Sequence, residues 1–379
     1  MNPIPILHIK DSSGLFGSER VILTLARNID RRRFDFHLLC MRRRDGRSAP
    51  FIELARRSGI QVVPVDVDRR FDGRALKALR GILRDRRIAI LHAHDYKSDL
   101  YGLLGSLNLP LKRVLTSHGS TRDSRLKRLY LDLDERLIYP RYDRIVAVSA
   151  ALGRTLSRKP YLNGKVRVIP NGLDADLLRT QAQSADRRAG RPAVPKEAGV
   201  FLTAVVGRLF PDKGHRYFLE ALERLRERHP GLKALIVGDG PEKEALAGRI
   251  RAHHLEDAVR MCGFVADMPA VYRAIDCLVM PSLTEGLPYT LLEAMNYGVP
   301  VIATAVGDIP DLIRPGRTGV LIPPAQAEAI VNALEAVIRD PASARRLAEA
   351  GRRLVQDEYS AASMARHMEK LYLELTTAT

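Results

Sequence analysis

The chain is poor in cysteine, in tryptophan and in long apolar runs. It has 379 residues, of which three are cysteines and none is tryptophan. Cys40, Cys262 and Cys277 form no CxxC pair, so the sequence predicts neither a disulfide scaffold nor a cysteine-rich zinc site and fits a reducing compartment. No apolar run approaches the ~18 residues of a membrane-spanning helix. The first ten residues lack the basic start and cleavage site of a signal peptide, so we expect a cytoplasmic protein.

Acidic residues are scarce in the first half of the chain. Residues 1–190 carry 38 Lys plus Arg against 20 Asp plus Glu, whereas residues 191–379 carry 23 against 24. The net charge of +17 therefore lies entirely in the first half. Such an imbalance is typical of a protein that meets an anionic membrane or a nucleic acid, and the alternative is a solvated, arginine-rich surface. Because aromatic residues make up only 6%, no base-stacking platform is evident, and we expect no nucleic-acid partner.

Two features favour an anionic membrane surface as a partner. Arginines cluster at 31–33 and 42–44, and residues 122–137 carry apolar side chains at helical spacing. This stripe comprises Leu126, Leu129, Tyr130, Leu133 and Leu137, and it is flanked by Arg122, Arg125, Lys127 and Arg128. A basic amphipathic helix can lie in the interface of an anionic bilayer, which would place the protein peripherally on the inner face of the cell membrane. An ordinary surface helix with its apolar face on the core explains the same pattern.

Short β-rich runs alternate with helical stretches along the whole chain. The expected strands are 4–9, 36–40, 62–65, 90–92, 113–116, 144–148 and 166–169 in the first half, and 201–206, 234–237, 259–262, 277–280, 299–303 and 319–322 in the second. This alternation predicts an α/β protein with two doubly wound, Rossmann-like domains. A polar stretch rich in Pro and Gly, residues 180–199, separates them. We expect domains at 1–185 and 186–358, and a final helix over 359–379.

Doubly wound sheets bind ligands outside the carboxyl ends of their strands, so with two such domains we expect a site in the cleft between them. The strongest motif runs from Glu285 to Glu293, directly after the strand 277–280. Pro288 suits the first turn of a helix, which would leave the amides near Tyr289, Thr290 and Leu291 unpaired and ready for phosphate.

A second motif, residues 207–214, follows the strand 201–206. Gly207 permits close approach of the backbone, while Arg208 offers a planar fork and Lys213 a mobile point charge. The two cations suit a diphosphate and would stabilise the charge on a departing one. The alternative is an ordinary strand-to-helix turn with solvated charges.

Other motifs are weaker. His118 follows the strand 113–116 and is placed to meet a ligand, although a lone histidine is more often structural. The loop with Gly14 and Gly17 opens a helix after the first strand, but it is not a dinucleotide fingerprint. His92 and His94 alternate at a strand end with no obvious third ligand, so we expect no metal site.

Taken together, these residues resemble the retaining GT-B-type glycosyltransferases of family 4, also called group 1. The segments that carry the resemblance are the Glu285/Glu293 pair, 207–214, 117–119, 170–172, 238–241 and 293–304. The resemblance runs nearly end to end. It implies two facing Rossmann-like domains, a last helix that crosses back to the first domain, and a nucleotide-sugar donor held mainly by the second. Two departures are the Phe16-Gly17 pair in the first loop and the segment 307–311.

The resemblance also implies roles for residues. Arg208 and Lys213 would clamp the donor diphosphate, Glu285 would touch the donor sugar, and His118 would lie near the reacting centre. Glu293 would hold the ribose. The remaining expected binding residues are Gly14, Gly17, Asn171, Gly207, Gly263, Phe264, Val265, Gly286, Leu287, Tyr289, Thr290 and Leu291, of which 263–265 would border the base.

The expected activity is the retaining transfer of a sugar to a hydroxyl acceptor without metal or other cofactor. The acceptor would be a sugar or a lipid-linked glycan in cell-envelope, exopolysaccharide or glycolipid synthesis. Two alternatives stay open: a sugar-phosphate synthase or epimerase on the same fold, and a non-catalytic binder of polyanions.

Overall fold

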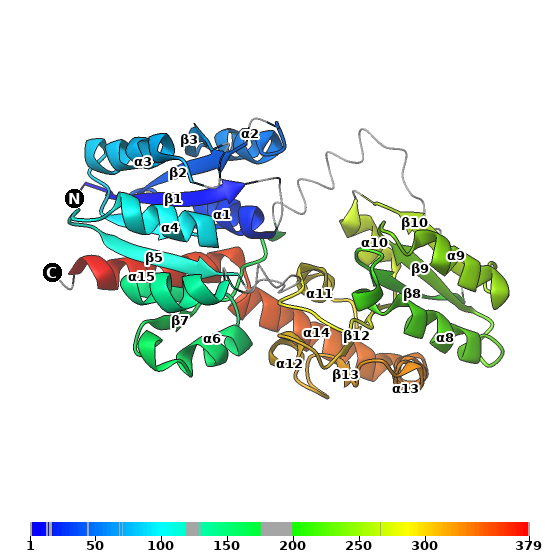
Figure 1. Cartoon of the computed structure of the whole chain (residues 1–379). Coiled ribbons are helices and arrows are strands. Elements are labelled where there is room, and N and C mark those ends of the chain that lie inside the picture. Colours follow the sequence, from blue (N-terminus) through cyan, green and yellow to red (C-terminus); the bar gives the residue numbers. More distant parts are fainter. Residues whose placement is uncertain are drawn as a thin grey trace. The chain divides into compact units, whose positions relative to one another are not determined.

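A computed structural model of the chain describes residues 2–12, 14, 17–43, 45–67, 69, 71–118, 129, 131–175, 199–265 and 267–377. The chain forms two compact units, one of residues 1–172 with 361–379 and the other of residues 173–360 (Figure 1). The expected boundary between residues 185 and 186 lies outside the described residues.

A parallel sheet of seven strands forms the centre of the first unit, in the order β3-β2-β1-β4-β5-β6-β7. The strands are β1 (Ile4–Ser12), β2 (Phe34–Arg42), β3 (Gln61–Asp66), β4 (Ile90–Ala93), β5 (Lys112–Ser117), β6 (Arg144–Ala147) and β7 (Val166–Val168). The strand order reverses between β1 and β4, where His8 pairs with His92. Doubly wound sheets bind ligands at this kind of reversal.

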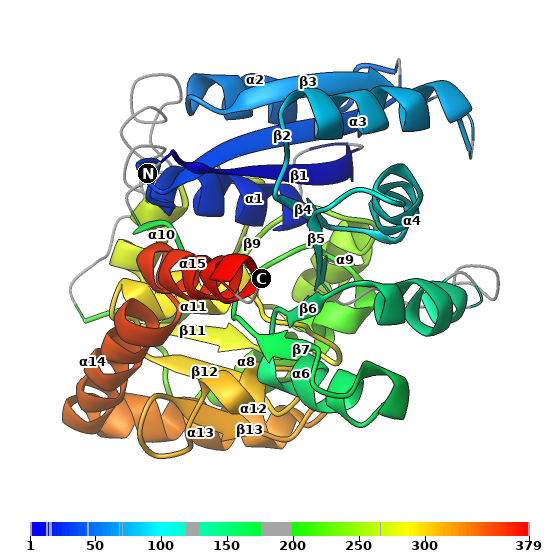
Figure 2. The same ribbon diagram turned by 90° about the vertical axis from the view of Figure 1, so that its left-hand side faces the viewer.

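Helices cover both faces of this sheet. They are α1 (Gly17–Asn28), α2 (Ala49–Arg57), α3 (Gly73–Asp85), α4 (Tyr96–Gly105), α6 (Ala150–Ser157) and α15 (Ala361–Thr377), with the single-turn elements η1 (Asp134–Ile138), η2 (Tyr139–Arg141) and η3 (Pro160–Leu162). One face packs its Leu, Ile and Tyr side chains into an apolar core with α3 and α4. On the other face α15 lies against α1 (Figure 2), and Tyr372 of α15 contacts the rings of His8 and His92.

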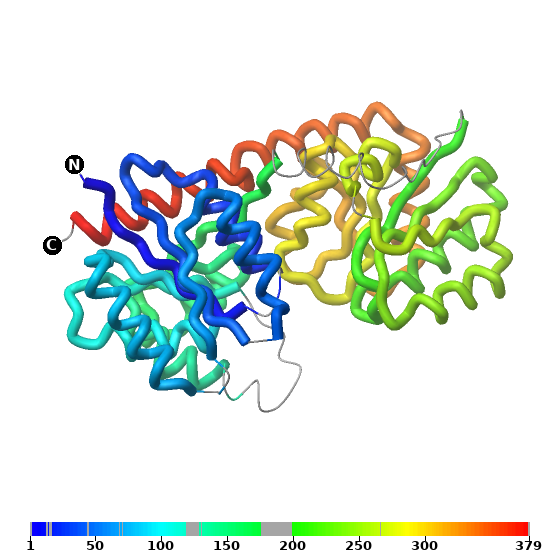
Figure 3. Tube along the Cα trace, turned by 90° about the horizontal axis from the view of Figure 1, so that it is seen from above, coloured from blue at the N-terminus to red at the C-terminus, as the bar shows by residue number. Residues whose placement is uncertain are grey.

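Local sequence explains where these helices begin. Asp95 accepts hydrogen bonds from the amides of Lys97 and Ser98 and so caps α4. Asp72 caps α3 in the same way. Such caps satisfy amides that lack a partner in the first turn of a helix. The first and last described residues lie near each other in the first unit, where residues 2 and 3 and residues 375 and 376 line a common cavity (Figure 3).

A second parallel sheet, of six strands in the order β10-β9-β8-β11-β12-β13, forms the other unit. Its strands are β8 (Phe201–Val206), β9 (Leu232–Val237), β10 (Val259–Gly263), β11 (Cys277–Met280), β12 (Val301–Thr304) and β13 (Val320–Ile322). Its helices are η4 (Pro211–Lys213), α8 (His215–Leu225), α9 (Lys243–Ala252), α10 (Met268–Ala274), α11 (Tyr289–Asn296), α12 (Ile309–Leu312), α13 (Ala327–Arg339) and α14 (Pro341–Glu358). Apolar cores lie on both faces of the sheet.

The predicted α/β class with two doubly wound parallel sheets is confirmed. The 18-residue helix α14 was not predicted, although Asp340 caps it and Pro341 begins it. Among the described residues, no helix combines the length and the apolar character needed to cross a membrane.

Candidate functional site

Two loops of the second unit meet where β8 and β11, neighbours in the sheet, end. The first loop comprises residues 207–214 and the second residues 281–288. The amide of Leu283 donates to the carbonyl oxygen of Asp212 at 2.7 Å and ties the loops together. Gly214 has φ +67°, and a Cβ there would lie 2.0 Å from the carbonyl oxygen of Pro281. Only glycine permits this backbone shape at this close approach.

The contact between the loops brings Lys213 to Glu285. Lys213 Nζ lies 2.7 Å from Glu285 Oε1, and the two side chains are 17% and 11% exposed. Ser282 Oγ donates to the same carboxylate oxygen at 2.8 Å. A charge-assisted hydrogen bond of this kind fixes both side chains. The predicted cation for a diphosphate and the predicted sugar-binding carboxylate are thus partners.

Gly307 holds the Glu285 backbone from the other side. Its φ is +56°, and a Cβ there would lie 1.8 Å from the carbonyl oxygen of Glu285. Thr304 Oγ1 donates to the carbonyl oxygen of Ser282 at 2.6 Å. The loop that carries Glu285 therefore rests on the residues that follow β12. The exposed Gly286 and half-buried Leu287 continue the same loop.

Arg208 remains exposed on the first loop, directly after Gly207. Its guanidinium carbon lies 4.9 Å from the ring centroid of Phe210. This cation–π contact orients the guanidinium but leaves its donors for an incoming anion. Within the described part of the chain, no ion pair engages Arg208, in contrast to Lys213.

The helix α11 begins at Tyr289, with Pro288 as its extended N-cap. Tyr289 and Thr290 occupy the first turn, as expected. The expectation that the amide of Leu291 is unpaired is wrong, because it donates to the carbonyl oxygen of Pro288 at 3.1 Å. The helix starts one residue later than expected, and a tight i→i−3 turn at this start satisfies the amide.

Glu293 lies in the interior of α11 and is 8% exposed. Its Oε2 accepts a hydrogen bond from the hydroxyl of Tyr272 at 2.8 Å. Burial, together with the charge of Glu293, raises the pKa of Tyr272, so this hydroxyl remains a donor at neutral pH. Sequence reasoning missed Tyr272, because it belongs to α10 and meets Glu293 only through packing.

Gly263 ends β10 at an irregularity in its pairing with β9, and its φ is +65°. Phe264 follows with 82% of its surface exposed, and Val265 is half-buried. The expected border of the nucleobase therefore presents an aromatic ring to solvent. An exposed ring of this size is available for stacking.

The remaining expected residues belong to the first unit. His118 directly follows β5, and Gly17 begins α1. The carbonyl oxygen of Gly14 accepts a hydrogen bond from Ser12 Oγ at 2.9 Å. Asn171 is 8% exposed and follows β7.

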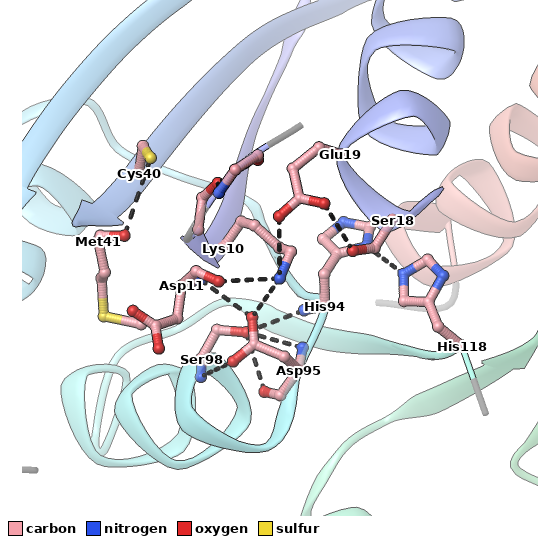
Figure 4. A network of polar contacts seen from close by, with 12 residues as sticks. Lys10, Asp11, Ser18, Glu19, Cys40, Met41, His94, Asp95, Ser98 and His118 are labelled. Carbon is pink, nitrogen blue, oxygen red and sulfur yellow. Dashed lines mark hydrogen bonds and ion pairs between the residues drawn. The ribbon is translucent and has the colours of Figure 1, made fainter. Parts of the chain in front are cut away.

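A buried charge cluster at the ends of β1 and β4 was not predicted (Figure 4). Lys10 Nζ lies 3.2 Å from Asp95 Oδ2 and 3.5 Å from Glu19 Oε1. Burial by itself lowers the pKa of Lys10, but the charges of Asp95 and Glu19 outweigh it and raise this pKa. Burial raises the pKa of Asp11, and the charge of Asp95 adds to this effect. Lys10 is therefore a permanent cation at the reversal of the strand order.

His8 supplies the third imidazole that the sequence did not reveal next to His92 and His94. Ligand atoms of these three buried residues lie within 4.8 Å of one another, and within the described residues no other group of His, Cys, Asp or Glu meets this criterion. The strand register brings His8 to the other two histidines, since residues 8 and 92 are paired on adjacent strands.

Two family models match the chain. "Glycosyl transferases group 1" matches residues 186–354, and "Glycosyltransferase Family 4" matches residues 17–177. Together they leave only the chain ends and a short internal segment unmatched.

Curated relatives are similar to this chain at modest identity. The 2-deoxystreptamine glucosyltransferase of Streptomyces kanamyceticus is 31% identical over 51% of this chain and 50% of its own length. The chain thus matches about half of that relative. The Escherichia coli UDP-Gal:alpha-D-GlcNAc-diphosphoundecaprenol alpha-1,3-galactosyltransferase is 26% identical over 89% of this chain and 88% of its own length.

A solved structure shares the fold. HepE of Anabaena, in complex with UDP, aligns with a TM-score of 0.80 over 98% of this chain and 100% of its own, at 20% identity.

Proposed function

Since the chain belongs to the group 1 glycosyltransferases of family 4, we propose that it moves a sugar from a nucleoside-diphosphate sugar to a hydroxyl acceptor with retention of configuration. The observation that carries the proposal is the pairing of Lys213 with Glu285 at 2.7 Å, next to the first turn of α11. A cation and a helix N-terminus suit the phosphates of a sugar diphosphate, and a carboxylate suits the hydroxyls of its sugar.

A diphosphate offers Lys213 a stronger anionic partner than one carboxylate, and Arg208 is exposed and able to join it. Glu285, still held by Ser282 Oγ, is then able to accept hydrogen bonds from the sugar hydroxyls. The amides of Tyr289 and Thr290 in the first turn of α11 face the phosphate in the field of the helix dipole.

In the proposed reaction the acceptor oxygen attacks the anomeric carbon from the face that the diphosphate leaves. The bond between this carbon and the phosphate oxygen breaks, and its electron pair stays on the departing diphosphate. A phosphate oxygen takes the acceptor proton, so no dedicated protein base is required. The contribution of the protein is positioning and stabilisation of charge.

We further propose that the reaction needs no metal, because Arg208, Lys213 and the α11 N-terminus supply the positive charge that a divalent ion would otherwise provide. EDTA is expected to leave turnover unchanged. A loss of activity that magnesium restores would contradict this part of the proposal.

For the acceptor, we propose a lipid-linked or cell-envelope glycan presented at an anionic membrane surface. Leu129, Leu133 and Leu137 recur every four residues and are 55%, 43% and 51% exposed, which favours the interfacial interpretation over a core-facing helix. Leu126, Tyr130 and the flanking basic residues 122–128 lie outside the described residues. Separately, a cavity of about 1110 Å³ is lined by Arg27, Arg31, Arg57, Arg86 and Arg87.

The donor is tested first by thermal unfolding in a panel of nucleotide sugars. A ligand that binds only the native state raises the free energy of unfolding, by ~2.7 kcal/mol at one hundred times its Kd, and therefore raises the melting temperature. The stabilising nucleotide sugar is then incubated with the enzyme alone and with candidate acceptors. Conversion of the donor without acceptor to an isomeric nucleotide sugar would favour an epimerase, and the absence of any stabilising nucleotide sugar would refute the proposal.

A further inference from the structure

Five hydrogen bonds link six side chains into one unbroken chain in the first unit. His118 Nε2 lies 3.2 Å from His94 Nδ1 (Figure 4), and His94 Nε2 lies 2.8 Å from His8 Nδ1. The hydroxyl of Tyr372 joins His8 Nε2 at 3.1 Å to His92 Nδ1 at 2.6 Å. The chain ends at Thr116 Oγ1, 2.7 Å from His92 Nε2.

His118 is the end of this chain that can meet a ligand. His8, His92 and Tyr372 are 0% exposed, and His94 and Thr116 are 3% and 4% exposed. His118 is half-buried. The five other members are therefore shielded from water and can satisfy their polar atoms only with one another.

All four imidazoles are neutral at physiological pH. Burial lowers the pKa of His8 and of His118 to about 3. Burial, followed by the neighbouring histidines, also lowers the pKa of His92 and His94 well below 6.5. A neutral imidazole has one N–H donor and one bare nitrogen acceptor. A ring that accepts a hydrogen bond on one side therefore donates one on the other, so all bonds along the chain run in the same direction.

The atom order gives this chain only two fully satisfied proton arrangements. Each of His94, His8 and His92 presents Nδ1 toward the His118 end and Nε2 toward the Thr116 end. If Thr116 donates, Tyr372 donates to His8 and all four rings carry their proton on Nδ1. If His118 donates from Nε2, Tyr372 donates to His92 and all four rings carry their proton on Nε2. Any mixture leaves two lone pairs or two protons facing each other, or leaves the hydroxyl proton of Tyr372 without an acceptor in the chain.

We propose that Tyr372, His8, His92 and His94 are positioning residues that lock the ring and the tautomer of His118, and so decide whether His118 Nδ1 donates to or accepts from a bound sugar hydroxyl. This inference rests on the proposed function for its consequence in turnover. The chain does not conduct protons, because it ends at a threonine hydroxyl, which is far too weak an acid to supply one. The C-terminal helix α15 thereby acts on a residue at the carboxyl end of β5.

The ring geometry favours this interpretation over a metal site formed by the same histidines. The rings of His92 and His94 are stacked with centroids 4.5 Å apart and planes 16° apart, and those of His8 and His94 with centroids 5.0 Å apart and planes 22° apart. Nearly parallel stacked rings do not direct their lone pairs at a common point, which a metal ion requires.

The first test is a histidine ¹⁵N NMR spectrum of the wild-type protein, with the His118 signals assigned by His118→Ala. The nitrogen shifts report which ring nitrogen carries the proton. We expect His8, His92, His94 and His118 to show the same neutral tautomer. Opposite tautomers among these four histidines would overturn the proposal, and so would shifts of their ring-nitrogen signals on addition of stoichiometric zinc. Neither result depends on an activity measurement.

The second test is Tyr372→Phe, which removes the linking hydroxyl and keeps the ring. The matched control is Tyr142→Phe, since Tyr142 is equally buried in the same unit but donates to the carbonyl oxygen of Asp99 at 2.7 Å. We expect Tyr372→Phe alone to give a mixture of tautomers at His118 and to lower kcat up to about tenfold, with the KM for the donor nearly unchanged.

Equal losses of kcat in the two variants, with the His118 tautomer unchanged in Tyr372→Phe, would show that the hydroxyl serves only stability. If the proposed sugar transfer itself is wrong, no variant has turnover. The tautomers then still test the proposed hydrogen-bond chain. If Tyr372→Phe does not fold, the wild-type spectrum still decides it.

Discussion

At the scale of single residues, Lys213 and Arg208 are two cations in different states. Lys213 is paired with Glu285 at 2.7 Å, whereas Arg208 is exposed above Phe210. A diphosphate must therefore displace a carboxylate from Lys213 but not from Arg208. The proposed clamp thus consists of a preoriented guanidinium and a lysine that exchanges partners.

We expect Lys213→Ala and Arg208→Ala each to lower kcat/KM by about 100-fold or more, because each removes a preorganised charge next to the leaving group. Turnover with the donor found by thermal unfolding measures the effect. Lys233→Ala is the control, since Lys233 Nζ binds the carbonyl oxygen of Asp257, on a different loop of the same unit. Near-normal rates in either clamp variant would refute the clamp.

The sequence indicated the residue types of the proposed donor site because each follows a strand, and parallel strands end at one edge of a sheet. Lys213 and Glu285 could be expected to meet on this ground alone. Tyr272 could not, since a tyrosine on a buried helix has no local mark of its partner. The amide of Leu291 was misjudged because the sequence does not show whether the first turn of a helix is tightened by an i→i−3 hydrogen bond.

At the scale of elements, the loop that carries Glu285 depends on glycines with left-handed backbone. Gly307 has φ +56° and leaves no room for a Cβ against the Glu285 carbonyl oxygen, whereas Gly316 has φ +71° and nothing within 4 Å. Comparing alanine substitutions at the two positions therefore separates the effect of backbone strain from that of a steric clash.

Gly316→Ala should cost about 1 kcal/mol of stability through strain alone and keep the donor-induced rise in melting temperature. Gly307→Ala should cost more, because the Glu285 loop must move, and should abolish that rise. Thermal unfolding with and without donor measures both quantities. The idea fails if Gly307→Ala responds to donor as Gly316→Ala does.

The contact between α4 and η1 buries two carboxyl groups. Asp99 and Asp134 are 2% and 7% exposed, and each has one oxygen without a hydrogen-bond partner. Burial raises the pKa of Asp134 to about 7, and burial with the charge of Asp134 raises that of Asp99. The folded state thus holds protons that the unfolded state releases near pH 4.

Because the folded state binds more protons between pH 4 and 7, this pair makes the free energy of unfolding fall as pH rises through that range. We expect the stability advantage of Asp134→Asn over wild type to be larger at pH 8 than at pH 5, by at least ~1 kcal/mol. Denaturant unfolding at both pH values measures this. Asp85→Asn, the same change of charge at an exposed position of α3, should show no such dependence on pH, and a gain at pH 5 equal to that at pH 8 would contradict the assignment.

At the scale of the whole molecule, the charge of the chain is divided unevenly along the sequence. The first 190 residues hold an excess of 18 positive charges and the remainder is nearly neutral. In the described part of the chain the first unit also exposes the leucines of the proposed interfacial stripe. An anionic bilayer attracts basic surfaces by roughly 1 kcal/mol per Lys or Arg near it.

We expect the protein to float with anionic vesicles at low salt. With neutral vesicles it should stay behind in solution. Replacing Arg27, Arg31 and Arg57, which line the arginine cavity, together by serine should reduce flotation with anionic vesicles. Leu133→Ser should reduce it as well. The matched control replaces the exposed Arg339, Arg345 and Arg346 of the second unit. Equal flotation with neutral vesicles, or an equal loss in the control, would argue against membrane docking.

Alternation of strands and helices along the chain was enough to determine the α/β class and the strand ends where chemistry gathers, since both follow from local periodicity and from the polarity of parallel sheets. The histidine chain depended on tertiary structure. Residues 8 and 92 become neighbours through strand register, and Tyr372 joins His8 across 364 positions of sequence. Pairing at such separations is determined by how strands and helices pack, and no local pattern records it.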